Sequence, residues 1–292
     1  MSLNVVQDDN AAWNGIRPPY TADSQLETMP SNHATAGIAS ARNVPTEPVP
    51  PPAANLSVPP VDLEELAEQS RRLETAAPRE IIAWAVERYF PKLSMATAFG
   101  PEGCAIIHWL AEIEPRTHVF NLESGYQFKE TLELRDRIAV RYGIEVELKR
   151  PEHSVEVYEA IHGGPLYKTN PDQCCNDRKI KVLKQAAVGW DAWMSGIRRD
   201  QSPDRAKAPI VGWDKKFGLV KISPLANWTK QQVWKLIVEE NVPYNPLHDQ
   251  GYTSIGCWPC TRAVMFGEDE RAGRWSGNVK TECGLHTLDD KE

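Results

Sequence analysis

The chain has 292 residues, of which 41% are hydrophobic and 25% are charged, and its formal net charge is −7. A chain of this length and composition folds into one or two globular domains, and its acidic balance argues against non-specific nucleic-acid binding. It contains no apolar run long enough to span a membrane, and its N-terminus lacks the basic and apolar regions of a secretory signal. We therefore expect a cytoplasmic protein without a membrane or nucleic-acid partner.

Residues 1–60 differ in composition from the rest of the chain. They contain ten of the 23 prolines and show no hydrophobic periodicity. Such a segment buries too little apolar surface to offset the entropy that is lost when it is ordered. We expect a disordered, proline-rich tail here, with a docking motif or a targeting peptide as the alternative.

From residue 61 on, the hydrophobic pattern alternates between helical and strand periods. The expected helices cover 61–76, 78–90, 103–113, 126–142 and 229–241, with Thr229 as an N-cap, and another begins near Cys174. The expected strands cover 93–99, 117–123, 144–149 and 191–197, and 219–225 is a candidate fifth. Strands separated by helices predict an α/β fold, in which helices cover both faces of a twisted parallel sheet.

The last 40 residues have no clear period and are rich in Gly, Cys, Trp and Arg. Such a segment is more typical of a binding or catalytic site than of a core element. We therefore expect residues 61–250 to form one α/β nucleotide-binding domain and residues 251–292 to pack on it as a site-forming segment.

Two pairs of cysteines stand out among the six in the chain. Cys174 and Cys175 are adjacent, and Cys257 and Cys260 form a C-x-x-C pair. Buried free thiols, a redox-active dithiol and a metal centre are the three interpretations. A dithiol leaves the adjacent pair unexplained, and adjacent side chains point apart, which suits a single zinc ion poorly. The four thiolates therefore favour an iron–sulfur cluster over zinc, whereas Cys104 lies on an apolar helix face and is expected to be a buried thiol.

The sixth cysteine, Cys283, lies in the sequence ECGLH near the end of the chain. Arg271, Arg274 and Lys280 precede it, and His286 follows three residues later. A nucleophilic thiolate requires exposure and nearby positive charge. The sequence thus indicates a catalytic nucleophile, with an incidental exposed thiol as the alternative.

Further stretches are candidates for binding an anion or a nucleotide. Arg198 and Arg199 follow the strand expected at 191–197, and ligands of open α/β sheets bind at the carboxyl ends of strands. Guanidinium groups suit phosphate or sulfate there, although a solvated loop would look the same. Lys179 lies about one helical turn after the adjacent cysteines and could face the same substrate. The glycine-containing corner at 94–103 could hold a nucleotide with its backbone N–H groups, or it could be a plain turn.

Over residues 78–292, these motifs resemble those of the assimilatory adenylylsulfate (APS) reductases, which belong to the phosphosulfate reductase family. The matching stretches are the adjacent cysteines with Arg178-Lys179-Ile180, SGIRRDQS at 195–202, NVPYNPLHDQGY at 241–252, IGCWPCTR at 255–262, GEDERAGRW at 267–275 and ECGLH at 282–286. The stretch NLESG at 121–125 is similar to the family's L-D-T-G motif, with Glu and Ser in place of Asp and Thr.

The resemblance implies a fold like that of the adenine-nucleotide α-hydrolases, a bound [4Fe–4S] cluster and a catalytic cysteine. The cluster ligands that it implies are Cys174, Cys175, Cys257 and Cys260, and the nucleophile is Cys283. Residues 251–292 would then form a cluster-binding and catalytic segment. The residues that the resemblance implies as substrate contacts are Lys179, Arg198, Arg199, Arg271, Arg274, His286, Ser94, Thr97 and Gly125.

The implied activity is the reduction of APS to sulfite and AMP, in sulfate assimilation and cysteine biosynthesis. A thiosulfonate would form on Cys283, and thioredoxin would supply the electrons. The two cysteine pairs favour APS over its 3′-phosphorylated analogue PAPS, so a PAPS reductase is the alternative within the family. Outside it, the alternatives are a non-catalytic, metal-stabilised nucleotide-binding protein and a tRNA-thiolating enzyme, although the S-G-G-x-D-S loop of ATP pyrophosphatases is absent. The oligomeric state is left open, and a homo-oligomer is compatible with the sequence.

Overall fold

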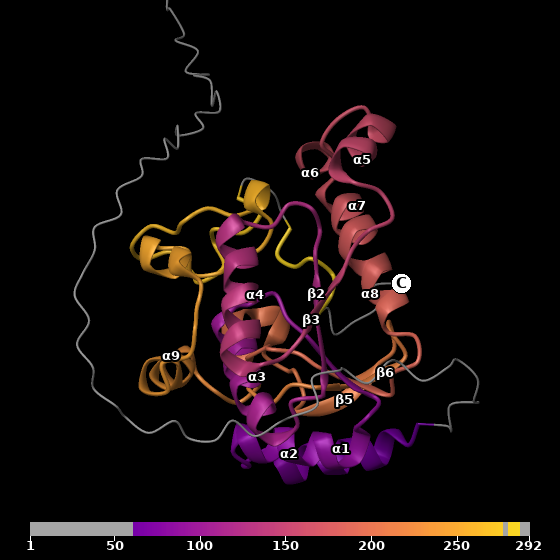
Figure 1. Ribbon diagram of the computed structural model, residues 1–292, viewed down its shortest axis with the longest axis vertical. Coiled ribbons are helices and arrows are strands. Elements are labelled where there is room, and N and C mark those ends of the chain that lie inside the picture. The colour runs from indigo at the N-terminus through magenta and orange to yellow at the C-terminus, as the bar shows by residue number, and fades with distance from the viewer. Residues whose placement is uncertain (1–60, 277–279, 287–292) are drawn as a thin grey trace, which may run out of the picture. The chain divides into compact units, whose positions relative to one another are not determined.

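The computed structural model describes residues 61–276 and 280–286, and Figure 1 shows how their helices and strands are arranged. The tail expected at 1–60 therefore lies outside the described residues. None of the described helices is both long and apolar enough to cross a membrane.

Six strands of the described residues form one sheet in the order β3–β2–β1–β4–β6–β5. Neighbouring strands run parallel, except that β5 pairs with β6 in the antiparallel sense. The strands are β1 (Leu93–Ala96), β2 (His118–Leu122), β3 (Val146–Lys149), β4 (Ala192–Met194), β5 (Val211–Asp214) and β6 (Leu219–Ile222).

The helices of the described part follow the expected positions from α1 to α4 and at α9. They are α1 (Leu63–Leu73), α2 (Pro78–Tyr89), α3 (Pro101–Ile113), α4 (Lys129–Tyr142), α5 (Val155–His162), α6 (Leu166–Thr169), α7 (Pro171–Cys175), α8 (Lys181–Ala186) and α9 (Lys230–Glu239). Thr229 caps α9, because its hydroxyl accepts a hydrogen bond from the Gln232 N–H. A π-helical turn at Asn176–Ile180 joins α7 to α8, directly after the adjacent cysteines.

The two faces of the sheet bury two separate hydrophobic cores. Alternate strand residues point to opposite faces, so Leu93 and Met95 of β1 join one core together with α2, α3, α4 and α9. Trp193 of β4 and Leu219 of β6 join the other core, which packs against α8. Helices therefore cover both faces of a sheet that is mostly parallel, and the predicted fold class is confirmed.

Two features of the sheet differ from the expectation. Strand β5 was not predicted, because the short run Val211–Asp214 shows no clear alternation and lies at the edge of the sheet. The strands expected at 93–99 and 191–197 end earlier, at Ala96 and Met194. The chain leaves the sheet at these two points, and the loops that follow are free to form a binding site.

The strand order reverses at β1, between β2 and β4. From β1 the chain continues to β2 and β3 on one side, whereas β4 pairs with the other side of β1. The loops after β1 and β4 therefore diverge and leave a crevice at their carboxyl ends, which is the usual position of ligands in open α/β sheets.

Candidate active site

A cavity lies at the carboxyl ends of β1, β2 and β4. Part of its wall comes from the loops after these strands, and the rest comes from residues 253–257, 270–275 and 282–286. The predicted site residues that line this cavity are Cys283, Lys179, Arg271, Arg274, His286, Thr97 and Cys257. The fold therefore brings the predicted nucleophile together with four of the predicted basic side chains.

Close backbone packing shapes the end of the cavity near β1. A Cβ on Gly103 would lie 2.5 Å from Thr97 Oγ1, and a Cβ on Gly196 would lie 3.1 Å from the Gly103 nitrogen. Glycine is therefore needed for the loops after β1 and β4 to approach the first turn of α3. Thr97 Oγ1 accepts a hydrogen bond of 2.9 Å from the Phe99 N–H, which fixes the turn into α3. The first-turn N–H groups of α3 suit a phosphate or ribose oxygen at this end.

Two buried acceptors on the cavity wall have no partner among the described residues. Asn121 Nδ2 donates to the Thr97 carbonyl at 2.7 Å, so Asn121 Oδ1 accepts from Gln127 Nε2 at 2.8 Å. This network leaves Gln127 Oε1 buried and unpaired. His248 bonds a backbone carbonyl through Nδ1, which leaves its buried Nε2 as an unpaired acceptor. Such acceptors suit the amino group of a nucleobase.

Ion pairs and hydrogen bonds hold residues 280–286 against the cavity. The buried Glu282 accepts hydrogen bonds from Arg205 at 2.8 and 3.1 Å and lies 3.1 Å from Arg271 Nη2. Lys216 Nζ donates to the Gly284 carbonyl at 2.6 Å. Gly284 has a φ of +82°, a conformation that favours glycine, so the chain turns directly after the nucleophile. These contacts anchor the segment on both sides of Cys283.

Burial changes the pKa values of the basic groups along this wall in different ways. Burial and the neighbouring Arg205 lower the pKa of Arg271 to about 10, so its guanidinium stays charged at neutral pH. Burial, with Lys221 adding to it, holds the pKa of His286 well below its usual range, so its imidazole is neutral. Burial acts against the charged form of Lys179, but nearby cysteine thiolates outweigh it and raise the pKa. The wall therefore combines cations with one neutral imidazole.

A second, smaller pocket is lined by Cys174, Cys175, Cys257 and Cys260. Burial, followed by repulsion from the neighbouring thiolates, raises the pKa of Cys174 to about 12. Within residues 61–276 and 280–286, no group of three or more His, Cys, Asp or Glu side chains is arranged to hold a metal ion. The residues that line both the pocket and the cavity are Ser124, Lys179, Cys257, Arg274 and Trp275. The four cysteines thus surround a space that shares a wall with the cavity.

The remaining cysteine is separate from both spaces. All six cysteines are free thiols, and Cys104 is fully buried in α3 within the larger core. Burial raises the pKa of its thiol to about 12. Cys104 is therefore the buried thiol that the sequence predicted.

Comparison with known proteins identifies the family. Residues 92–263 match the family model of the phosphoadenosine phosphosulfate reductase domain. The chain belongs to the phosphoadenosine phosphosulfate reductase family. The resemblance that the motifs indicated is thus confirmed.

Relatives in this family match the chain over most of their length. A Gloeobacter violaceus protein named phosphoadenosine 5′-phosphosulfate reductase is 46% identical over 77% of this chain and 95% of its own. A Salinibacter ruber protein named adenosine 5′-phosphosulfate reductase is 41% identical over 82% of this chain and 96% of its own. A crystal structure of phosphoadenylyl-sulfate reductase from Candida auris, in a phosphate complex, superposes with a TM-score of 0.62 at 30% identity. It covers 70% of this chain and 98% of its own.

Among the residues that the family resemblance implied, Ser94 and Gly125 do not line the cavity. Ser94 is buried in β1, where its hydroxyl lies 3.4 Å from the Ala192 carbonyl of β4. Gly125 has a φ of +80° and packs against the guanidinium of Arg178. Both residues lie beside elements that shape the site, and their contact with a substrate stays a prediction.

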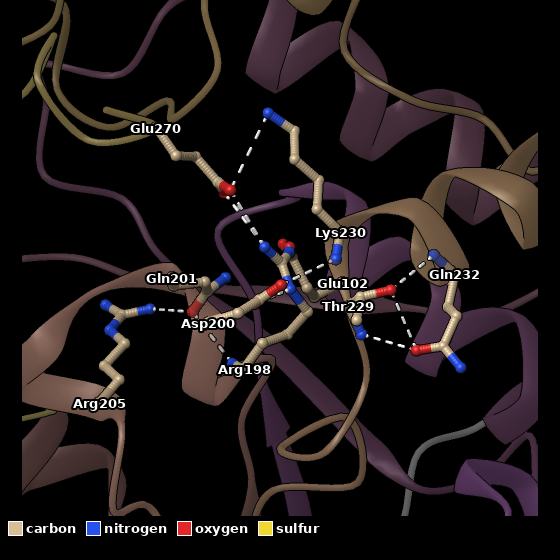
Figure 2. A network of polar contacts seen from close by, with 9 residues as sticks. All are labelled: Glu102, Arg198, Asp200, Gln201, Arg205, Thr229, Lys230, Gln232 and Glu270. Atoms are coloured by element: carbon tan, nitrogen blue, oxygen red, sulfur yellow. Dashed lines mark hydrogen bonds and ion pairs between the residues drawn. The ribbon is translucent and has the colours of Figure 1, made fainter. Parts of the chain in front are cut away.

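Arg198 is buried and likewise does not line the cavity. Figure 2 shows it at the centre of a network of polar contacts. Its side chain is 1% exposed and contacts three carboxylates, those of Glu102, Asp200 and Glu270. The Arg198 Nε–Asp200 distance is 2.8 Å, and the Arg198 Nη2–Glu270 distance is 3.1 Å. Glu270 directly precedes Arg271, so Arg198 anchors the stretch that brings Arg271 and Arg274 to the cavity.

Arg199 points away from the cavity in the same loop. Its guanidinium pairs with Glu74, which follows α1, and donates to the Ala208 carbonyl at 2.8 Å. Neither Arg198 nor Arg199 lines the cavity, and their contacts with a substrate stay predictions.

The residues that support the site were mostly missed from the sequence. They are Gln127, Trp193, Arg205, Lys216, Lys221 and Glu282. Glu282 adjoins Cys283, and Lys221 is a charged residue inside the strand pattern LVKISPL, so both carried a local signal. Arg205 and Lys216 carried none, because their partners lie 77 and 68 residues further along the chain.

Proposed function

We propose that the protein is an adenylylsulfate reductase, which converts APS and a dithiol into AMP, sulfite and a disulfide in sulfate assimilation. The observation that supports this most is that Cys283 shares one cavity wall with Lys179, Arg271, Arg274 and His286. The phosphate and sulfonate of APS are both anionic and repel a thiolate unless cations offset their charge. The glycine-lined corner after β1 and the unpaired acceptors suit the nucleoside part of the same substrate.

In the first step, the Cys283 thiolate attacks the sulfonate sulfur of APS. A sulfur–sulfur bond forms, the bond from that sulfur to the bridging oxygen breaks, and its electron pair leaves with AMP. Lys179, Arg271 and Arg274 offset the charge of the phosphosulfate as this bond breaks. The product on the enzyme is a Cys283 thiosulfonate.

In the second step, an external dithiol, which we take to be thioredoxin, releases sulfite. One of its thiolates attacks Cys283 Sγ, and sulfite leaves with the electron pair of the sulfur–sulfur bond. The second thiol then resolves the mixed disulfide and restores the Cys283 thiolate, so the dithiol supplies two electrons in all. Cys283 is only 9% exposed, so the segment 280–286 has to open for this step. Thioredoxin as partner is consistent with a reaction in the cytoplasm.

The four cysteines of the smaller pocket supply the donor set of a [4Fe–4S] cluster, although the described side chains are not gathered around one metal position. They line one space, and thiolates are the ligands of such clusters. When bound, the cluster would supply local charge beside the cavity and need not change its redox state. Lys179 lines both spaces. Burial acts against its charge, but the charges of Cys257 and Cys283 raise its pKa, so it keeps its proton. Residues 251–292 would thus serve as a segment for both cluster binding and catalysis.

A second candidate substrate is PAPS, which carries an additional 3′-phosphate. The Gloeobacter violaceus relative, at 46% identity, is named for that substrate. The two cysteine pairs of this chain favour APS. A steady-state comparison of kcat/KM for APS and PAPS decides between them, and a higher value for PAPS would overturn the choice of APS.

The test of the reaction uses the intact mass of the protein. After incubation with APS and no reductant, we expect one added sulfonate group, which thioredoxin removes as sulfite. The adduct should be absent from Cys283→Ser and retained by Cys104→Ala, which removes a fully buried thiol that does not line the cavity. An adduct that persists in Cys283→Ser would contradict the assignment of the nucleophile. Iron and labile sulfide, measured on the same samples, test the cluster separately.

A further inference from the structure

Lys221 is a buried charge on the sheet face that lies under the catalytic segment. Strand β6 alternates between the two cores, so Val220 and Ile222 point to one face and Lys221 points to the other, together with Trp193. The Lys221 side chain is only 12% exposed. A lysine at such a position is costly unless its ammonium group has specific partners.

The partners of Lys221 include the last described residue of the catalytic segment. Its Nζ lies 3.3 Å from Nδ1 of His286, 3.8 Å from Asp214 Oδ2 and 5.0 Å from the centre of the Trp193 ring. The His286 ring in turn stacks on Trp193, with ring centres 6.0 Å apart and planes 10° apart. Lys221, His286 and Trp193 therefore form one packed group beside the cavity.

The chemistry of the two groups decides which nitrogen of His286 carries the proton. An ammonium group has donors and no acceptor, so the nitrogen that faces it must be the acceptor. A neutral imidazole with an acceptor at Nδ1 carries its proton on Nε2. Because His286 lines the cavity, Nε2 is the nitrogen left for a ligand.

We propose that Lys221 is a positioning residue that holds His286 in the Nε2–H tautomer, so that His286 donates a hydrogen bond to an anionic oxygen of the phosphosulfate. This proposal rests on the proposed function, because it names a phosphosulfate as the group that accepts the bond. In the opposite tautomer, the Nε2 lone pair would face the anion and repel it. His286 thus acts as an oriented neutral donor, while Lys179, Arg271 and Arg274 supply the positive charge.

The charge on Lys221 depends on groups from several elements. Burial lowers the pKa of Lys221 to about 8, although Asp214 acts in the opposite direction. The other charged or titratable groups around it are Arg205, Lys216, Glu282, Cys283 and His286. Since the charged form is the one disfavoured, Lys221 loses its proton as the pH rises through about 8. Neutral Lys221 can accept from Nδ1–H, so the orientation of the His286 donor is lost on the alkaline side.

The direct test reads the tautomer of His286 in the holoprotein by long-range ¹H–¹⁵N correlation of labelled histidine. The spectrum holds seven histidines, and His286→Asn assigns the signal. We expect protonated Nε2 and unprotonated Nδ1 in the wild type, and a gain of the Nδ1–H form in Lys221→Met. A wild-type His286 that carries its proton on Nδ1 would overturn the proposal.

The functional test measures AMP release from APS in a single turnover at pH 7 without reductant. Lys221→Met should slow it by at least roughly tenfold, since a hydrogen bond to a charged group is lost. In the His286→Asn background the same substitution should change it by less than about twofold, because Lys221 acts through His286. Equal effects in both backgrounds would overturn the proposal. So would an equal loss in Lys215→Met, which removes an exposed lysine from the turn between β5 and β6.

If Lys221→Met does not fold, Lys221→Arg is the second variant, because it keeps a buried cation and a hydrogen-bond donor at this position. Arginine stays protonated above pH 8, so the ratio of wild-type to Lys221→Arg rates should fall as the pH rises past about 8. A ratio that stays constant over this pH range would contradict the role of Lys221. A wild type that releases no AMP from APS would contradict the proposed function instead, and the tautomer measurement would still decide on Lys221.

Discussion

Two pairs of arginines that look alike in the sequence have different surroundings in the folded chain. Arg271 and Arg274 line the cavity beside Cys283. Arg198 and Arg199 follow β4 at the edge where a ligand is expected, yet both are bound to carboxylates of the protein. Position at the carboxyl end of a strand therefore does not by itself make an arginine a ligand contact.

The side chains that each arginine contacts explain why one pair lines the cavity and the other does not. Arg274 lies 4.4 Å above the Trp275 ring, and its Nε is buried without a partner among the described residues, so this donor is available to a ligand. Arg198 has three carboxylates around one guanidinium, so its donors are used within the protein (Figure 2). Arg198 and Arg199 hold the loops of the site together. Arg271 also pairs with Glu282, but among the described residues its Nε and that of Arg274 are buried without a partner, so each arginine at the cavity keeps a donor for an anion.

The largest effect is expected for Arg198→Met. Three carboxylates lose the guanidinium that they share, and removing one partner of a buried ion pair costs about 3–5 kcal/mol. We expect the thermal midpoint of unfolding to fall by roughly 10 °C. Arg262→Met is the control, because Arg262 pairs with Glu268 on the surface, where solvent screens the pair, so its midpoint should stay close to that of the wild type. A normal midpoint with lost activity would instead make Arg198 a substrate contact.

Arg274→Met and Arg271→Met should act on the reaction. Removing a donor that faces developing charge typically slows a reaction by about 100–1,000-fold. We expect such a loss in the rate of thiosulfonate formation, measured in a single turnover by intact mass, with the thermal midpoint much less affected than in Arg198→Met. A rate within about threefold of the wild type would remove the arginine concerned from the proposed site.

This contrast shows how much the sequence could predict. The fold class followed from the alternation of strands and helices, because each strand carries its own hydrophobic pattern. The cysteines and cations of the cavity followed from motifs in which each residue lies close to others of the site. The pairing of Arg198 with Glu270, or of Arg205 with Glu282, joins positions 72 and 77 residues apart. No local pattern encodes such a pair, so the sequence identified the cations but not which of them were neutralised.

Gly256→Ala tests how far the position of Arg274 matters, as distinct from its charge. A Cβ at this residue would lie 2.2 Å from Arg274 Nη2, so the guanidinium would have to move. We expect a roughly tenfold slower thiosulfonate formation, since the charge stays nearby but is misplaced. In the Arg274→Met background, Gly256→Ala should have little further effect. An undiminished loss there would mean that the glycine acts on another part of the site.

The smallest effect is expected for Arg199→Met. Arg199 and Glu74 are 29% and 42% exposed, so solvent screens their ion pair, and its loss should cost about 0.2–1 kcal/mol at neutral pH. The hydrogen bond from Arg199 lowers the pKa of Glu74 below 4.5. A carboxyl whose pKa is lowered on folding stabilises the protein above its unfolded pKa. The loss of unfolding free energy that Arg199→Met causes through this ion pair should therefore become smaller as the pH falls through 4.5 and below.

Urea denaturation of the wild type, Arg199→Met and Glu74→Gln between pH 7 and pH 4 measures this dependence. At pH 7, Glu74→Gln should lower the free energy of unfolding by most of the amount that Arg199→Met does, because it removes the other partner of the same ion pair. The rate of thiosulfonate formation should stay unchanged in both variants, since neither side chain lines the cavity. If Arg199→Met slowed that reaction while Glu74→Gln did not, Arg199 would leave Glu74 during turnover and contact the substrate, and the two pairs of arginines would share one role.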